Sequence, residues 1–217
     1  SGQTGLTKML AAAPDGYTIS IMTGDTFGTQ AAGKPNWKFS DITPVAIMIK
    51  QPSAFFVPVA SPIKTWNDLV AEAKKRPLKV AVTGFGTPDD ITVNYFTKKG
   101  INLASVPFAN PGERSTAILG GHADLLYEQL GDVKTLLESN QIRPIVIFDT
   151  QRFPLYADVH TSVDVGHPVN INQFRMVTVK AGTDPQKVKV LADALAKVAA
   201  SDDYKAYLTD QYANPKS

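Results

Sequence analysis

Apolar and polar positions along the chain switch repeatedly between two patterns. Residues 79–83 form a short β-branched run, as in a buried parallel strand, and residues 91–96 carry apolar side chains at helical spacing. A second strand at residues 104–108 and a second helix at residues 113–120 repeat the arrangement. This alternation of strand, loop and helix is typical of an α/β protein, and we expect a largely parallel sheet with helices on both faces.

The remainder of the chain carries further runs of the same two kinds. We expect the end of a helix at residues 5–13 and a small-residue loop at residues 23–29. Pro52 and Pro58 place the extended run 54–59 at a sheet edge or a crossover. Other strands are expected at residues 17–22, 43–50, 123–128, 143–148 and 172–180, and other helices at 66–75, 133–139, from Asp184 onward and at 202–211.

The loop at residues 84–90 combines glycine with helix-starting residues. Thr87 can cap a helix, Pro88 suits its first position, and Asp90 stands three residues after Thr87, as in a capping box. In open α/β sheets such loops, at the carboxyl ends of strands, are where ligands bind. A glycine-rich turn can equally serve only to reverse the chain, without binding a ligand. The dinucleotide pattern is absent, because Asp89 stands where its third glycine should be.

Composition narrows the function classes. The net charge is only +2, and the basic residues are scattered, so nucleic acid is not an implied partner. The chain has no cysteine, which rules out disulfides and is compatible with a bacterial periplasm. His122, His160 and His167 lie far apart in the sequence, so we expect neither a metal site nor a cofactor.

Four sequence blocks carry a family resemblance. They are Ala-Ala-Pro-Asp-Gly-Tyr-Thr (12–18), Phe-Ser-Asp-Ile-Thr-Pro-Val-Ala (39–46), Leu-Gly-Gly-His-Ala-Asp (119–124) and Ala-Gly-Thr-Asp-Pro (181–185). In this order they resemble the substrate-binding proteins of tripartite tricarboxylate transporters, the Bug family of bacterial extracytoplasmic receptors.

The resemblance implies a two-lobed α/β fold of the periplasmic-binding-protein type (type II) with two hinge strands. Residues 1–53 and 170–217 would form one lobe, and residues 54–169 the other. A small organic acid or amino-acid-like ligand would be held between the lobes and delivered to membrane permease subunits, without chemistry. The crossover segments 51–57 and 169–173 would absorb the closing motion.

We expect the ligand to be bound by backbone N–H groups, hydroxyls and one amide. Gly86 and Thr87 would offer donors at a helix start, Asn110 would orient the ligand, and Phe85 would shield it from water. The candidate ligand-binding residues are Thr23, Asp25, Thr26, Gly84, Phe85, Gly86, Thr87, Asn110 and Glu128.

The chain departs from the family pattern at its start. Family members usually begin with a strand, a Pro/Gly-rich loop and a helix, whereas residues 1–5 here resemble the loop after the second strand. We therefore expect about 50 residues to be absent, on ordinary domain length. If the absent strand belongs in the first lobe's sheet, an isolated chain should be poorly stable.

The second departure from the family pattern is a group of acidic residues. Asp89 and Asp90 stand where the family typically has Ser, Thr or His, and Glu113 and Glu128 follow neighbouring strands. Asp89 and Asp90 can be solvent-facing first-turn acids, as helix starts prefer. Alternatively, the pocket prefers an amino compound, a monoanion or a neutral solute. Arg114 could offset the acids, although a lone arginine is usually a solvated surface residue.

Two other function classes remain open at this point. A small hydrolase or isomerase could use Asp124 or Glu128 as a general base, because residues four apart on a strand share a face. A sensor subunit could bind a protein partner without a ligand. The sequence contains no Gly-x-Ser-x-Gly motif, which removes one common context for a nucleophilic serine.

Overall fold

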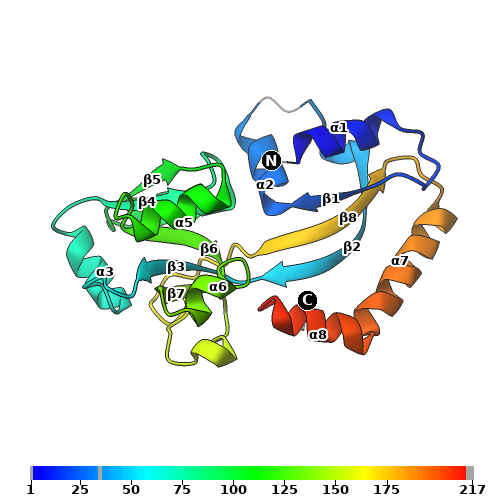
Figure 1. Ribbon diagram of the computed structural model, residues 1–217. Helices are drawn as coiled ribbons and strands as arrows, with labels where there is room; N and C mark the ends of the chain where they lie inside the picture. The colour runs from blue at the N-terminus through cyan, green and yellow to red at the C-terminus, as the bar shows by residue number, and fades with distance from the viewer. Residues whose placement is uncertain (1, 34–35, 214–217) are drawn as a thin grey trace. The chain divides into compact units, whose positions relative to one another are not determined.

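The computed structural model describes residues 2–33 and 36–213, and it divides into two compact units (Figure 1). Unit 1 consists of residues 1–51 and 173–217, and unit 2 of residues 52–172. The chain therefore passes between the units twice, once after Gln51 and once before Gln173.

Unit 1 is built on an antiparallel sheet in the order β1-β8-β2. Figure 1 shows α1 on one side of this sheet and α7 with α8 on the other. Leu6 and Met9 of α1 pack on Met22 and Trp37 to form its main core. Its elements are α1 (Gln3–Ala11), β1 (Ile19–Thr23), α2 (Gly24–Ala32), η1 (Phe39–Asp41), β2 (Ile42–Gln51), β8 (Gln173–Lys180), α7 (Pro185–Ala200) and α8 (Asp202–Asp210).

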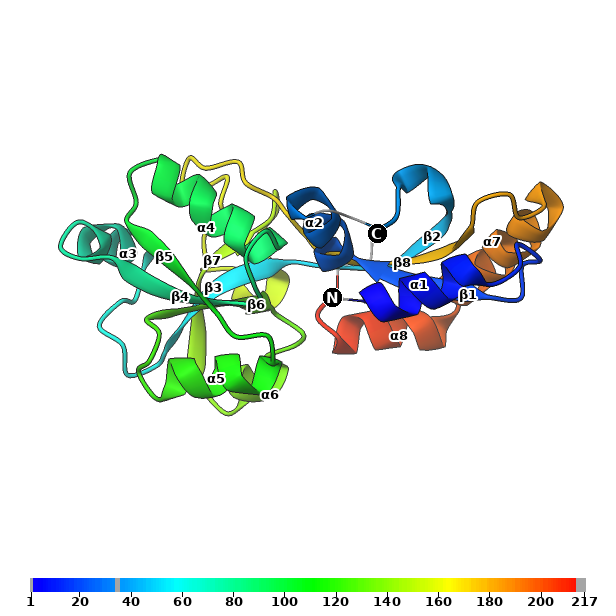
Figure 2. The same cartoon turned by 90° about the horizontal axis from the view of Figure 1, so that it is seen from above.

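Unit 2 holds a mixed sheet in the order β5-β4-β6-β3-β7. Figure 2 shows α4 and α5 on opposite faces of it. Phe55, Phe96 and Phe148 are fully buried at the centre of its core. Its elements are β3 (Ser53–Pro58), α3 (Trp66–Ala73), β4 (Leu78–Val82), α4 (Pro88–Lys98), β5 (Leu103–Pro107), α5 (Pro111–Leu119), β6 (Leu125–Gln129), α6 (Lys134–Glu138), β7 (Ile142–Phe148) and η2 (Pro154–Tyr156).

The expectation of a largely parallel sheet is wrong for much of the chain. Strand β4 pairs in parallel with β5 and β6, but β3 runs antiparallel to both of its neighbours. The sheet of unit 1 is antiparallel throughout. Of the two alternatives for the extended run 54–59, an edge strand is wrong, because β3 pairs with both β6 and β7, whereas β3 does directly follow the first crossing between the units. Pro52 precedes β3 and Pro58 ends it, so the amides between them can pair.

The expected loop at residues 23–29 is wrong too, because α2 begins at Gly24. Its glycines and hydroxyl residues suggest a loop, but Thr23 takes the N-cap position. The backbone N–H of Thr23 donates to the Thr26 hydroxyl oxygen at 3.4 Å, and the Thr29 hydroxyl donates to the Asp25 carbonyl at 2.8 Å. Local side-chain hydrogen bonds thus start a helix that has little apolar periodicity.

Candidate ligand-binding site

Three parallel strands of unit 2 end at the same edge of their sheet. Strands β4, β5 and β6 finish at Val82, Pro107 and Gln129, and the Phe108 N–H donates to the Val82 carbonyl at 2.8 Å. Parallel pairing therefore brings the loop after β4, the loop after β5 and the last turn of β6 to one place. This is the edge at which open α/β sheets bind ligands.

Asp89 and Asp90 are buried at the start of α4, with exposed fractions of 3% and 7%. Asp89 accepts hydrogen bonds from the Thr83 N–H and the Thr87 hydroxyl. Asp90 accepts from the Gly86 N–H at 2.8 Å and from the Ser105 hydroxyl at 2.6 Å. The interpretation of these residues as solvent-facing acids is therefore wrong, since both carboxylates fold back and pin the loop.

The expected capping box at Thr87 and Asp90 is also wrong. Thr87 is the N-cap residue, but its one hydroxyl proton is shared between the Gly84 carbonyl, at 2.5 Å, and the Asp89 carboxylate, and the hydroxyl accepts no hydrogen bond from the helix. Asp90 reaches Gly86 rather than Thr87, because Gly86 adopts a φ of 76° that turns its N–H toward the helix start. The loop is thus closed by its own carboxylates.

Two donors predicted to bind the ligand are engaged in this arrangement. The Gly86 N–H and the Thr87 hydroxyl would have to leave Asp90, Asp89 and the Gly84 carbonyl to reach a ligand. Phe85, which lies between Gly84 and Gly86, leaves 69% of its surface exposed. The side chain at the tip of the loop is therefore available for contact, whereas the hydrogen-bonding groups beneath it are held.

Glu128 forms a buried ion pair with Arg114. Its Oε2 atom accepts from Arg114 Nε at 2.9 Å and Nη2 at 2.7 Å, and Arg114 Nη1 donates to the Phe108 carbonyl at 2.8 Å. Arg114 is only 4% exposed, so the expectation of a solvated arginine is wrong. The pair joins α5, β6 and the loop after β5.

Sequence reasoning did not include Arg114 among the site residues, although the signal was present. Arg114, Ala117 and Ile118 are the buried residues of α5, and their i, i+3, i+4 spacing is that of a helix face turned to the core. An arginine on such a stripe needs a buried acceptor, and Glu128 supplies it.

The electrostatics of Glu128 are set by burial. Desolvation raises the pKa of its carboxyl to about 7, and the nearby carboxylates of Asp132 and Asp89 act in the same direction. The Arg114 guanidinium opposes this effect and favours the ionised form. The carboxyl therefore changes its charge close to neutral pH.

Asp124 and Glu128 do not form one acid/base pair. Both Asp124 oxygens accept from Arg76, at 3.0 and 2.8 Å, and Oδ2 also accepts from the Lys79 N–H at 2.8 Å. Burial favours the neutral carboxyl, but these donors outweigh it and lower the pKa of Asp124. Because each carboxylate has its own arginine, the two belong to separate ion pairs.

Asn110 caps α5 beside a shallow groove. Its Oδ1 atom accepts from the Gly112 N–H at 2.9 Å, as an N-cap residue does. Phe108, Glu113 and His122 line the same groove, whose volume is about 660 Å³. Asn110 thus stands at the edge where the parallel strands end.

The three candidate residues of unit 1 gather at the start of α2. Thr23 is the N-cap, Asp25 lies in the first turn, and Thr26 is buried. The Asp25 Oδ2 atom accepts from Gln173 Nε2 at 3.0 Å, and the Gly24 N–H donates to Gln173 Oε1 at 2.7 Å. The structure therefore places the candidate residues in two groups, one in each unit.

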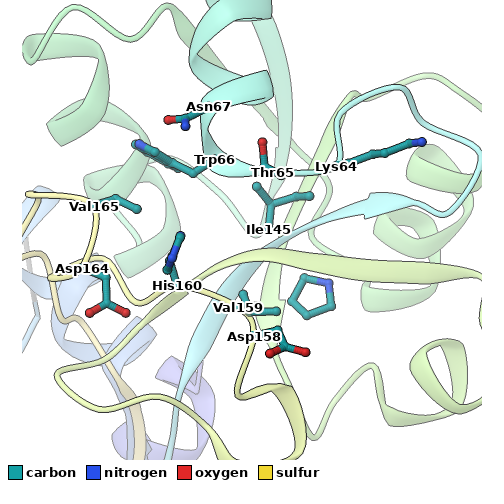
Figure 3. Close-up of a pocket in the computed structure, with 11 residues that line it drawn as sticks. Lys64, Thr65, Trp66, Asn67, Ile145, Asp158, Val159, His160, Asp164 and Val165 are labelled. Carbon is teal, nitrogen blue, oxygen red and sulfur yellow. The ribbon is translucent and has the colours of Figure 1, made fainter.

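A second pocket of about 460 Å³ lies elsewhere in unit 2. Figure 3 shows it between the start of α3, with Thr65 and Trp66, and the segment that carries His160 and Asp164. None of the candidate ligand-binding residues lines it. In residues 2–33 and 36–213, no group of three or more His, Asp or Glu side chains is placed to hold a metal ion, and no helix has the length and hydropathy of a membrane span.

Solved structures share this mixed α/β fold. A Rhodopseudomonas palustris protein solved with adipate superposes with a TM-score of 0.88 at 24% identity, covering 99% of this chain and 74% of its own. MatC from Rhodopseudomonas palustris, solved with bound malate, gives a TM-score of 0.81 at 25% identity, covering 98% and 74%. The fold is thus that of a two-lobed periplasmic binding protein, which confirms the expected fold class.

Sequence comparison identifies the family. The sequence model of the tripartite tricarboxylate transporter family receptor, TctC, matches residues 1–217. A relative from Cupriavidus necator, described as the UPF0065 protein in the gbd 5' region, is 27% identical over 208 residues, covering 92% of this chain and 62% of its own length. The chain belongs to the TctC receptor family, which confirms the resemblance seen in the four sequence blocks.

Proposed function

We propose that this chain is part of a periplasmic receptor that captures a small organic acid or amino-acid-like solute and delivers it to the membrane permease of a tripartite transporter. Units 1 and 2 would be its two lobes, and the two chain crossings its hinge. The function is solute binding, without covalent chemistry.

One observation carries the proposal. The loop after β4, Asn110 and Glu128 meet at the carboxyl edge of parallel strands, in a chain that the receptor family's sequence model matches along residues 1–217. That edge is where an α/β fold offers loop N–H groups and side chains to a solute.

The proposed contacts of unit 2 differ in role. Phe85 covers the ligand, while Gly84, Gly86 and Thr87 form the wall beneath it, held in shape by Asp89 and Asp90. Asn110 orients the ligand through its amide, and Glu128, through its pair with Arg114, holds the loop after β5 in place. Unit 1 contributes Thr23, Asp25 and Thr26 at the start of α2.

Two ligand classes have separate support. Malate and adipate, found in the two solved relatives, favour a carboxylate. The acids of this chain favour an amino group, because Asp89 and Asp90 already satisfy the N–H groups that an anion would otherwise take. An amino acid combines both groups.

A thermal-shift screen tests the proposal. The panel contains malate, adipate, aspartate, glutamate and a simple diamine, each with the wild-type protein and with the Phe85→Ala variant. A ligand that binds only the folded protein raises the unfolding midpoint by mass action, and Phe85→Ala should reduce that shift. Proton NMR spectra of the mixture should show only the signals of the unchanged ligand after incubation with the protein. Conversion of a stabilising compound into a product would favour an enzyme instead.

A further inference from the structure

Basic residues gather at the end of unit 2 where its parallel strands β4 and β5 begin. Strand β4 pairs with β5 from Leu78, which lies opposite Leu103, and the Leu78 N–H donates to the Asn102 carbonyl at 2.9 Å. The segment from α3 into β4 and the segment from α4 into β5 therefore meet here, and Figure 2 shows α3 at this end of the sheet. The two segments carry six cations, which we call the basic edge: Lys74, Lys75, Arg76, Lys79, Lys98 and Lys99.

All six residues of the basic edge are exposed, and few acids offset their charge. Glu72 pairs with Lys75 and Arg76, and Asp124 pairs with Arg76. The other four cations form no ion pair within residues 2–33 and 36–213. Six cations against these two acids leave a net charge of +4 at one end of unit 2, whereas the whole chain carries only +2.

Helix dipoles account for only part of this arrangement. Lys98 lies in the last turn of α4, and Lys74 is the C-cap of α3, so both meet the negative end of a helix. Lys79 meets neither helix end, because it lies within β4, opposite Ala104 of β5. The basic edge therefore has more positive charge than the helix ends require.

Acids occupy the opposite ends of the same strands. Strand β4 begins at Leu78 and ends at Val82, and the buried carboxylates of Asp89 and Asp90 lie in the segment that follows it. Positive and negative groups of unit 2 are thus separated along the strands. An anionic surface is attracted to the basic edge and not to the edge that carries the candidate ligand-binding residues.

The surroundings of the lysines indicate which kind of anionic surface they fit. Residues 72–79 and 98–104 have no exposed large hydrophobic side chain, and the basic-edge lysines line neither the 460 Å³ pocket nor the groove beside Asn110. Protein–protein interfaces are enriched in aromatic residues and arginine and depleted in lysine. Hydrated ammonium groups on flexible side chains instead match the phosphates of a membrane surface.

We propose that the basic edge holds unit 2 against an anionic lipid surface. The lysine ammonium groups lie close to the headgroup phosphates, and no apolar side chain enters the bilayer. Because the basic edge and the candidate ligand-binding edge are opposite ends of the same strands, the lipid surface does not cover the ligand-binding edge. This inference goes beyond solute binding and is independent of which solute the receptor takes.

Sedimentation with vesicles tests the proposal on the wild-type protein. Vesicles of equal parts phosphatidylglycerol and phosphatidylcholine should bind the protein at low ionic strength, whereas pure phosphatidylcholine vesicles should not. Salt at about 1 M should release the protein, because the Debye length then falls to about 3 Å. Absence of binding to the anionic vesicles at low ionic strength, or binding that salt leaves unchanged, overturns the proposal.

A triple variant locates the binding surface. Lys74→Gln/Lys79→Gln/Lys98→Gln removes three cations that have no ion-pair partner, at exposed positions where substitution hardly changes stability. Each cation near an anionic membrane strengthens binding by about a factor of five, so this variant should bind about a hundredfold more weakly. Thermal unfolding midpoints close to that of the wild type show that the variant is folded.

The matched control is Lys189→Gln/Lys197→Gln/Lys205→Gln, which removes the same charge from exposed positions of α7 and α8 in unit 1. It should bind the anionic vesicles nearly as well as the wild type. Equal weakening of the two triple variants overturns the assignment, because net charge alone would then explain binding. Tighter binding to soluble polyglutamate than to the vesicles also overturns it, in favour of an acidic protein partner.

Discussion

Arg114 and Glu128 join three segments of unit 2 through one buried guanidinium. Two of its N–H groups converge on the same Glu128 oxygen, at 2.9 and 2.7 Å, and a third bonds the Phe108 carbonyl at 2.8 Å. The position of the loop after β5, and of Asn110 within it, therefore depends on an ion pair that water hardly reaches.

Loss of Arg114 should be costly. Arg114→Met leaves a buried carboxylate without its partner, and we expect the free energy of unfolding to fall by about 3–5 kcal/mol. The double variant Arg114→Met/Glu128→Gln should recover part of this loss, since no charge is then left unpaired. Denaturant titration measures the free energy of unfolding of both variants.

Arg76→Met is the control for this prediction. Arg76 pairs with Asp124, but its side chain is half exposed, so the pair should contribute only about 1 kcal/mol. Equal losses for Arg76→Met and Arg114→Met would contradict the distinction drawn between the two ion pairs.

Glu128 should make stability depend on pH in a definite direction. Its folded pKa is about 7, above the ordinary 4.5, so between these values the folded protein keeps a proton that the unfolded chain has lost. Stability therefore falls as the pH rises from 4.5 to 7, by up to about 3 kcal/mol, and levels off above that range.

The difference between wild type and Glu128→Gln isolates this contribution, because glutamine does not titrate. Unfolding free energies measured at several pH values should show the steeper decline in the wild type. Parallel curves for the two proteins would show that Glu128 does not titrate in this window.

Gly86 should resist substitution more than Gly84 does. At a φ of 76° a Cβ atom is strained, so Gly86→Ala should cost about 1–2 kcal/mol. A Cβ at Gly84 would meet the nearest atom, Thr87 Cγ2, at an ordinary 3.9 Å, and Gly84→Ala should be nearly neutral. Thermal unfolding of the two variants gives the comparison, and equal midpoints would argue against the described turn.

The Asp90 carboxylate should hold the loop after β4 closed and slow the hydrogen exchange of its amides. Asp90→Leu removes the acceptor of both the Gly86 N–H and the Ser105 hydroxyl, and leaves these two donors without their partner. We expect a loss of about 1–3 kcal/mol and faster hydrogen exchange at Gly86. Ser105→Ala, which removes one donor and keeps the carboxylate, should cost less and leave Gly86 protected.

Much of unit 2 could be predicted from the sequence because its signals are local. Helix α3 begins at residue 66 as expected, with Thr65 as its N-cap, and α4 begins at Pro88 after Thr87, also as expected. In unit 1, the start of α7 after Asp184 followed from the same chemistry. These starts depend on neighbours within a few residues, which a single sequence displays.

The predictions from the sequence failed where residues distant along the chain determine the local structure. Asp90 is buried because Ser105, fifteen positions away, donates to it, and Arg114 is buried because Glu128 accepts from it across the sheet. Helix α2 lacks an apolar stripe, and its first N–H, that of Gly24, donates to the Gln173 side-chain oxygen across 149 positions. Strand direction likewise follows from pairing, which periodicity alone does not reveal.

Chemical-shift mapping with the most stabilising compound of the ligand panel tests the central claim most directly. We expect the backbone signals of Thr23, Asp25 and Thr26, together with those of residues 84–87, Asn110 and Glu128, to shift on titration and to saturate together. Shifts confined to the pocket around Thr65, Trp66 and His160 would contradict it, because the ligand would then bind at a site that none of the proposed residues lines.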